Sequence, residues 1–111
     1  MKVKWENVGV ITVDSGLCWI GDPCYVIHND KQKALGKTWD TFCNKLGKKY
    51  PTRKQFKHDP GHAGLGVCTS TGYGDGTYEV MAKIIEDKSI GKRIAELRII
   101  FINENEYDED V

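Results

Sequence analysis

Short apolar runs rich in β-branched residues, separated by turn residues, recur along most of this chain. Residues 8–13 form the first run, Asp14-Ser15-Gly16 interrupts it, and residues 17–20 resume the apolar pattern. Two such runs around a short polar break predict a β-hairpin. Pro23 cannot donate to a sheet ladder, so it ends the second strand. We expect residues 24–27 to continue as a short extended segment beyond that corner.

A helical period replaces the β pattern in the middle of the chain. Apolar residues at i, i+3, i+4 and i+7 predict a helix over residues 38–49 with Thr38 as its N-cap and Gly47 near its exit. The residues on its apolar face are Trp39, Phe42, Cys43 and Leu46. Residues 50–62 show no period and contain two prolines, so they predict a long, exposed, basic loop.

Three further β-type runs follow at residues 65–70, 77–85 and 93–102. Because turn residues separate them, we expect an antiparallel meander. The predicted fold class is α+β, mostly β: an antiparallel curled sheet, sandwich or small barrel of about five to six strands with one inserted helix. Residues 1–102 are expected to form a single domain and residues 103–111 an acidic tail, disordered in composition.

Length and composition agree with one folded domain and exclude some classes of protein. A chain of 111 residues with 40% hydrophobic residues can bury a core of its own. No run approaches the roughly 18 apolar residues of a membrane span. The first residues lack the pattern of a signal peptide. We therefore expect no membrane partner, a cytoplasmic location and reduced cysteines.

The net charge of zero hides a strong asymmetry along the chain. Residues 31–58 carry nine Lys and Arg and one acid, whereas residues 103–111 carry five acids and no base. The basic segment suits phosphate groups or an acidic partner, although Lys-rich segments also serve as solvated faces. A sequence pI near 6.8 argues against a dedicated binder of duplex nucleic acid. A small phosphorylated ligand fits this charge better than a nucleic-acid polymer.

The corner Asp22-Pro23-Cys24-Tyr25 carries the first candidate chemistry. In an architectural interpretation, Asp22 bonds nearby backbone N–H groups and Tyr25 packs on the core. In a functional interpretation, both face a cleft, where Tyr25 stacks on a ring and Asp22 accepts from a hydroxyl or an amine. The sequence leaves both interpretations open.

The turn Gly72-Tyr73-Gly74-Asp75-Gly76 carries the second set of candidate functional residues. Alternate glycines let the backbone approach an anion closely, and the hydroxyl of Thr71 lies just before them. No Lys-Ser or Lys-Thr pair follows, so the segment is not a P-loop. The glycines also fit an ordinary hairpin loop. Tyr73 favours a ligand or a partner chain, because an aromatic at a loop tip has little else to pack on.

These two motifs resemble those of a family of small bacterial and phage proteins of unknown function. Members of that family share the Asp-Pro-Cys-Tyr corner and the Gly-Tyr-Gly-Asp-Gly hairpin, and the resemblance covers residues 12–27 and 65–102. It implies a β-rich fold and no established activity. Phages also carry small proteins that sequester nucleotide immune signals, and the size and type of this chain suit that role by analogy.

The histidines and cysteines are the candidate residues for metal binding and for catalysis. His58 and His62 lie four residues apart, as do Cys24 and His28, so together they offer a Cys-His-His-His set. The first pair lies in a proline-glycine loop, which removes the helical spacing that such ligands use. No complete catalytic motif is present. We predict no metal, no cofactor and no catalytic residue, and we leave enzymatic activity open, leaning against it.

The leading hypothesis is non-enzymatic binding of a small phosphorylated or nucleotide-like ligand. Tyr25 and Tyr73 would stack on the ring, Asp22 and Asp75 would accept hydrogen bonds, and Arg53 and Lys54 would contact phosphate. The full predicted ligand set is Asp22, Tyr25, Arg53, Lys54, Thr71, Tyr73, Gly74 and Asp75. The alternative is a protein-interaction or structural module that uses the basic surface of residues 31–58. A homo-oligomer is also expected, because a small sheet leaves edges to cover.

Overall fold

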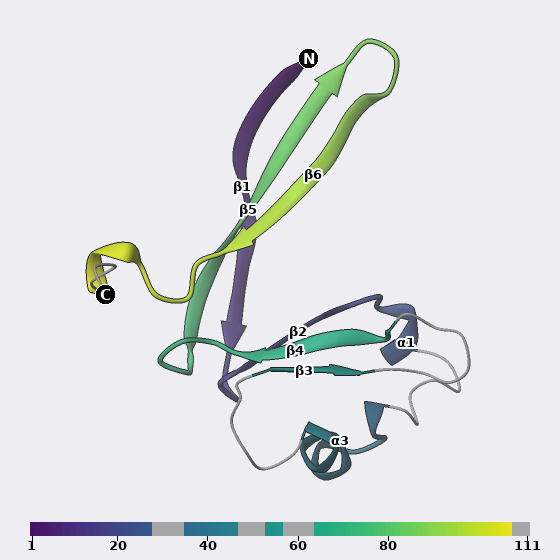
Figure 1. Cartoon of the computed structure of the whole chain (residues 1–111), viewed down its shortest axis with the longest axis vertical. Helices are drawn as coiled ribbons and strands as arrows, with labels where there is room; N and C mark the ends of the chain where they lie inside the picture. The colour runs from purple at the N-terminus through teal and green to yellow at the C-terminus, as the bar shows by residue number, and fades with distance from the viewer. Residues whose placement is uncertain (28–34, 47–52, 57–63, 108–111) are drawn as a thin grey trace. The chain divides into compact units, whose positions relative to one another are not determined.

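The computed structural model describes residues 1–27, 35–46, 53–56 and 64–107. It confirms the α+β, mostly β class, with strands arranged in two open antiparallel sheets rather than a closed barrel (Figure 1). The chain divides into two compact units, and each is described by itself. Unit 1 comprises Met1–Gly16 and Thr71–Val111, and unit 2 comprises Leu17–Ser70. The expectation of a single domain over residues 1–102 stays a prediction.

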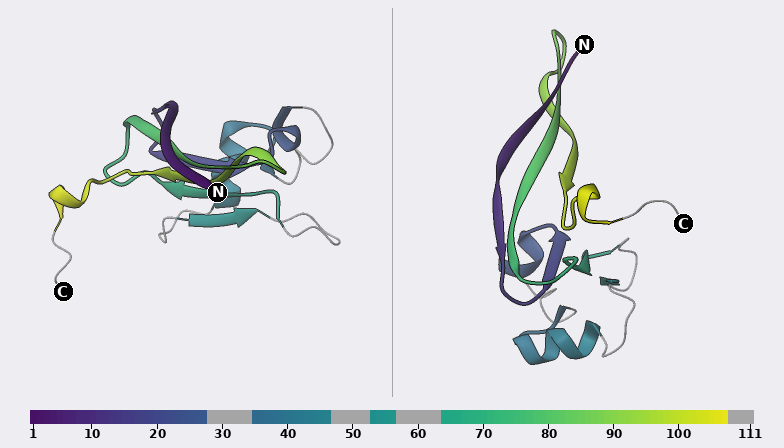
Figure 2. Two further views of the ribbon diagram at one scale, coloured as in Figure 1. Left: turned by 90° about the horizontal axis from the view of Figure 1, so that it is seen from above. Right: turned by 90° about the vertical axis from the view of Figure 1, so that its left-hand side faces the viewer.

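Unit 1 contains a three-stranded antiparallel sheet in the order β1-β5-β6. Its strands are β1 (Lys2–Val13), β5 (Gly76–Asp87) and β6 (Gly91–Ile99). Strand β1 shifts register between Asn7 and Gly9 where it pairs with β5. The β5–β6 ladder shifts between Lys83 and Ile84. Such bulges increase the local twist of a sheet, and the twist of this sheet is visible in Figure 2.

Unit 2 contains the second three-stranded sheet, in the order β2-β4-β3. Its strands are β2 (Leu17–Gly21), β3 (Arg53–Phe56) and β4 (Gly66–Ser70), and its helices are α1 (Cys24–Ile27) and α3 (Trp39–Leu46). The core cluster consists of Leu35, Phe56, Leu65 and Cys68, all at most 4% exposed. Phe42 of α3 stacks on Phe56 with ring centroids 5.1 Å apart, so the apolar face of the helix packs on the sheet.

Helix α3 forms where its period predicts, and Thr38 caps it. The amide of Thr41 donates to Thr38 Oγ1 at 3.2 Å, and the amide of Phe42 donates to the Thr38 carbonyl at 2.9 Å. The first of these bonds satisfies an amide of the first turn that has no partner inside the helix, and the second is the first backbone bond of the helix itself. The predicted exit at Gly47 lies outside the described residues.

Two predictions about strand pairing are wrong. Residues 8–13 and 17–20 are strands, but they form no hairpin, because β1 pairs with β5 and β2 pairs with β4. The last three runs form no meander, because β4 pairs with β2 and β3, and only β5 and β6 form a hairpin. The short breaks in the sequence mark where strands end. They do not determine which strand becomes the neighbour, since that depends on distant segments.

Three predictions about local structure are also wrong. Residues 24–27 form helix α1 rather than an extended segment, and residues 53–56 within the predicted loop 50–62 form β3. The predicted acidic tail starts with a 3-10 turn at Glu104–Glu106 rather than in disorder. There the Asn103 amide donates to Glu106 Oε2 at 2.9 Å. Asp22 before Pro23 is an N-cap pattern that could have indicated α1.

Candidate functional site

The glycine turn between β4 and β5 is held by hydrogen bonds inside unit 1. Thr71 is fully buried. Its amide donates to the Gly16 carbonyl at 3.1 Å, and its Oγ1 donates to the Gly74 carbonyl at 2.7 Å. The Tyr78 hydroxyl lies 3.0 Å from the Thr71 carbonyl and 2.6 Å from the Gly74 carbonyl, both of which can accept its proton. The polar groups of Thr71 and the Gly74 carbonyl are therefore used by the fold.

The tip of the same turn is open. The Tyr73 side chain is 75% exposed, and Asp75 is exposed. Gly74 has φ +116°, and a Cβ placed on it would have no atom within 4 Å. Of the four predicted site residues in this turn, Tyr73 and Asp75 therefore remain accessible to a ligand.

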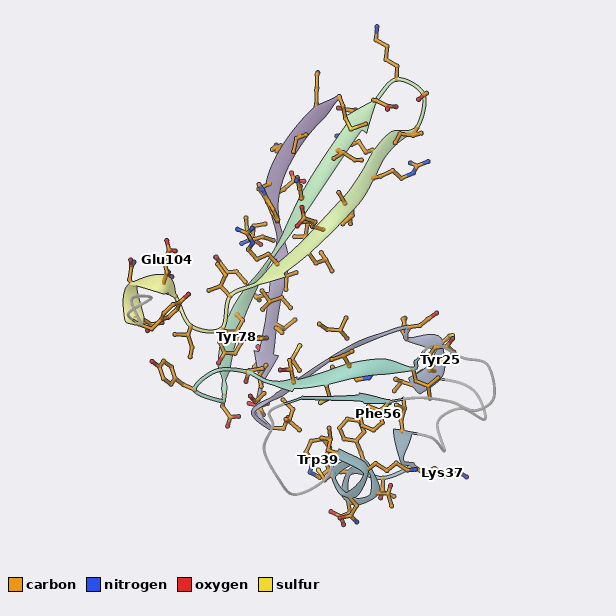
Figure 3. The ribbon with its side chains drawn as sticks, in the orientation of Figure 1. Tyr25, Lys37, Trp39, Phe56, Tyr78 and Glu104 are labelled. Atoms are coloured by element: carbon orange, nitrogen blue, oxygen red, sulfur yellow. The ribbon has the colours of Figure 1, made fainter. Side chains whose placement is uncertain are left out.

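The Asp22 corner acts as the start of helix α1. The Cys24 amide donates to Asp22 Oδ1 at 3.0 Å, and the Tyr25 amide donates to the Asp22 carbonyl at 3.1 Å. The bond from the Cys24 backbone holds the pKa of the Asp22 carboxyl below its usual value. Tyr25 is half-buried and packs against the core cluster of unit 2 (Figure 3). The geometry of both residues matches the architectural interpretation.

The predicted phosphate contacts lie in β3. The backbones of Arg53 and Lys54 pair with Thr69 and Cys68 of β4, and their side chains lie outside what is described. Together with Asp22 and Tyr25 they belong to unit 2, whereas Thr71, Tyr73, Gly74 and Asp75 belong to unit 1. The eight predicted ligand residues thus form two sets of four, one in each unit.

Metal binding and thiol chemistry find little support. The described residues contain no group of three His, Cys, Asp or Glu side chains arranged to hold a metal ion. His28, His58 and His62, which carry the metal hypothesis, lie outside those residues. Burial raises the pKa of the Cys18 and Cys68 thiols, which disfavours the reactive thiolate.

A groove of about 330 Å³ lies in unit 1, beside the Tyr78 ring. Tyr78 meets Phe101 edge-on there, with ring centroids 5.3 Å apart. The carboxyl groups of Glu79 and Glu106 also line the groove. Carboxylates repel phosphate, so this groove does not suit the phosphorylated ligand that the sequence suggests.

The largest unexpected feature is one side of the β1-β5-β6 sheet. Cross-strand pairs face the same side of a sheet, and three consecutive pairs of one face join β5 to β6 with apolar side chains only. These pairs are Val80–Ile99, Ala82–Leu97 and Ile84–Ile94, and we call these six residues the apolar face. Ile94 and Leu97 are 63% and 61% exposed. Alternation in residues 93–99 places Ile94 opposite to Leu97, so the sequence alone does not reveal this face, which depends on the register shift in the β5–β6 ladder.

The opposite side of this sheet is covered by its own long side chains. The Arg98 guanidinium lies over the Trp5 ring, 4.6 Å from its centroid. Lys83 Nζ and Glu96 Oε2 form an ion pair at 3.1 Å. These contacts shield apolar surface while keeping charges in water, as expected for a solvent-facing side. Val3 on this side is 57% exposed, so the contrast with the apolar face is confined to the region where β5 pairs with β6.

Among the described residues, no helix has the length and hydropathy that crossing a membrane requires. Comparison of the chain with family models, with curated proteins and with solved structures gave no match.

Proposed function

We propose that this chain is a protein-interaction module that binds its partner through the apolar face of the β1-β5-β6 sheet. The observation that carries the proposal is the exposure of Ile94 and Leu97, each above 60%, on the side where three consecutive β5–β6 pairs are apolar. Contiguous exposed apolar surface of this kind marks interaction sites. Burying one Leu or Ile side chain contributes about 1.5–3 kcal/mol.

The sheet also needs such a partner for its own stability. A sheet normally buries one apolar side against a second layer. Within the described residues of unit 1, the buried hydrophobic residues are Val13 and Ala82. The alternative function suggested by the sequence is a protein-interaction module with the basic segment 31–58 as its binding surface. We keep protein interaction as the function but assign it to the apolar face. Of the basic segment 31–58, Lys37 and Lys45 are described as exposed, and its role stays a prediction.

Site-specific photo-crosslinking in the producing cell tests the proposal. A photoreactive amino acid replaces Leu97 in one variant and Val3 in the control. Val3 pairs with Ile85, so it lies on the opposite side of the sheet, and at 57% it is about as exposed as Leu97. We expect protein adducts at position 97 and few at position 3. Absence of adducts at position 97, with the chain folded, would contradict the proposal.

We propose, as a second candidate, binding of a small nucleotide-like ligand at the glycine turn. The 75% exposed Tyr73, next to the open space at Gly74 and the exposed Asp75, supports it. Sequestration of a nucleotide immune signal by a phage protein remains the proposed role. Calorimetry with cyclic and ADP-ribose-type nucleotides tests this candidate. No heat at protein concentrations well above micromolar, or heat unchanged by Tyr73→Ala, would exclude it.

A further inference from the structure

Two neighbouring rows on the apolar side of the β1-β5-β6 sheet are complementary to each other. The first row runs across the strands as Lys4, Ile84 and Ile94, and the second as Glu6, Ala82 and Leu97. On β1 the two rows differ in the sign of their charge. On β5 they differ in size, since a large side chain is followed by a small one. On β6 both rows present exposed apolar side chains.

A two-fold axis that lies parallel to the sheet, perpendicular to the strands and between these rows exchanges one row with the other. A second copy placed by this axis sets its Glu6 over Lys4, its Ala82 over Ile84 and its Leu97 over Ile94. Face-to-face sheets pack about 10 Å apart, within reach of Lys and Glu side chains from both layers. On β5 a large residue then meets a small one, Ile84 over the fully buried Ala82, while on β6 two exposed apolar side chains, Leu97 and Ile94, come together.

We propose that the partner of the apolar face is a second copy of this chain, packed face to face about such a two-fold axis. This inference rests on the proposed function and names its partner. A two-fold interface uses the same surface patch on both copies, so it requires this internal complementarity. A partner of another sequence has no need of it. Lys4 and Glu6 already lie 3.8 Å apart within one copy, so the dimer would hold four charges of alternating sign.

The area that two copies share about this axis is small. The axis lies near one end of the strands, so about eight residues of each strand overlap with the second copy, a face of roughly 14 Å by 27 Å. Two copies then cover roughly 750 Å² in plan, which is below the value of about 1,000 Å² for a stable specific interface and in the range of a weak, transient one. We therefore expect a dimer of modest affinity that dissociates on dilution.

Sedimentation of the full chain over a range of concentrations measures this dimer. Leu97→Glu is expected to raise the dimer Kd on the order of 100-fold, because the two-fold axis buries the new carboxylate twice. Val3→Glu is the matched control, since it adds the same charge on the other side of the same sheet at similar exposure. We expect Val3→Glu to leave the Kd within a factor of about three of the unmodified chain.

A charge-reversal pair tests the predicted register directly. Lys4→Glu places two carboxylates on β1, and Glu6→Lys places two ammonium groups there. Each variant alone is expected to dimerise on the order of tenfold more weakly, because opposite charges across the axis become like charges. An equimolar mixture is expected to recover the affinity by forming heterodimers. Recovery on mixing cannot arise from the contact inside one chain, so it reports contact between copies.

The possible outcomes separate this inference from the proposed function. A dimer that Leu97→Glu weakens and that the mixture restores supports the inference. A monomer at all concentrations, with adducts to another protein at position 97, overturns the second copy and leaves the interaction module standing. A dimer indifferent to Leu97→Glu also overturns it. A monomer whose position 97 is protected from solvent labelling and forms no adducts overturns both, because the face is then covered within the chain.

Discussion

The two three-stranded sheets of this chain differ in how their apolar side chains are covered. The unit 2 sheet places Phe56 and Cys68 in a buried cluster with Leu35 and Leu65, under the aromatic ring of Phe42 from α3. The unit 1 sheet is longer, yet Leu97 on its edge strand β6 is 61% exposed. Pairing of strands and covering of a sheet are therefore separate events. Unit 2 achieves both from its own residues, whereas unit 1 pairs its strands and leaves apolar side chains of β6 exposed.

Truncating one leucine in each unit gives the largest expected contrast. Leu65→Ala removes a side chain that is 1% exposed and should lower the free energy of unfolding by about 3 kcal/mol. Leu97→Ala, measured where the chain is monomeric, should change it by less than about 0.5 kcal/mol. Urea denaturation followed by far-UV circular dichroism measures both. Equal losses would show that the two sheets are covered alike in solution.

Adding one methyl group to a glycine sharpens the contrast further. A Cβ on Gly66 would collide with the Trp19 ring and lie 2.8 Å from the Ile20 carbonyl, whereas one on Gly9 has no atom within 4 Å. Both glycines have positive φ, +158° and +149°, so Gly9→Ala serves as the control for backbone strain. We expect Gly66→Ala to cost about 2 kcal/mol more than Gly9→Ala in the same urea titration. Similar costs would mean that Trp19 moves aside freely.

Removing one hydroxyl from unit 1 tests whether its glycine turn is architectural. Tyr78→Phe removes the donor shared by the Thr71 and Gly74 carbonyls and should cost about 1 kcal/mol of unfolding free energy. Tyr73→Phe, at the exposed tip, should stay within about 0.5 kcal/mol. Thermal unfolding of both variants beside the unmodified chain provides the measurement. A larger loss for Tyr73→Phe than for Tyr78→Phe would reverse the roles assigned to these residues.

Acid is expected to loosen one turn in each unit, and we expect this effect to be smaller than those of the substitutions above. The pKa of Asp22 is held below its usual value by the Cys24 amide, and that of Asp87 by the Ile90 amide, 2.8 Å from Oδ1. When the pKa of an aspartate is lower in the folded chain than its unfolded value of about 3.9, the carboxylate stabilises the folded state at pH values above about 3.9. This contribution is lost as the pH falls further, through the pKa of the folded state. Amide chemical shifts of Cys24 and Ile90 should move below about pH 4. Asp22→Asn should abolish only the first of these transitions.

Local signals in the sequence predict local structure well. The spacing of Trp39, Phe42 and Leu46, with the Thr38 cap, gives the position of α3, because helix bonds join residues close in the chain. The alternation of residues 93–99 likewise indicates β6. The tetrapeptide Arg53–Phe56 shows no such period. These four residues form a strand because their backbone pairs with the edge of β4. No pattern within four residues can indicate that such an edge is present.

The candidate sites were predictable to a smaller extent. Asp22 and Tyr25 were predicted as ligand contacts with an architectural role as the alternative, and their geometry fits helix capping and core packing. The exposure of Tyr73 agrees with its predicted place at a turn tip. The apolar face was missed, because strict alternation places Ile94 and Leu97 on opposite sides, and only the bulge between Lys83 and Ile84 in the β5–β6 ladder brings them to one side. Whether another layer covers that side is a property of tertiary and quaternary structure.

The bond between the Gly16 carbonyl and the Thr71 amide has a consequence for the order of folding. Unit 1 is made of two segments, and all of unit 2 lies between them in the chain. Bringing β1 to β5 therefore closes a long loop, whose entropic cost grows with the length of flexible chain. If unit 2 folds first, that flexible length shrinks to a compact insert. The rate at which the long sheet of unit 1 assembles would then depend on how fast unit 2, with the local contacts of α3, folds.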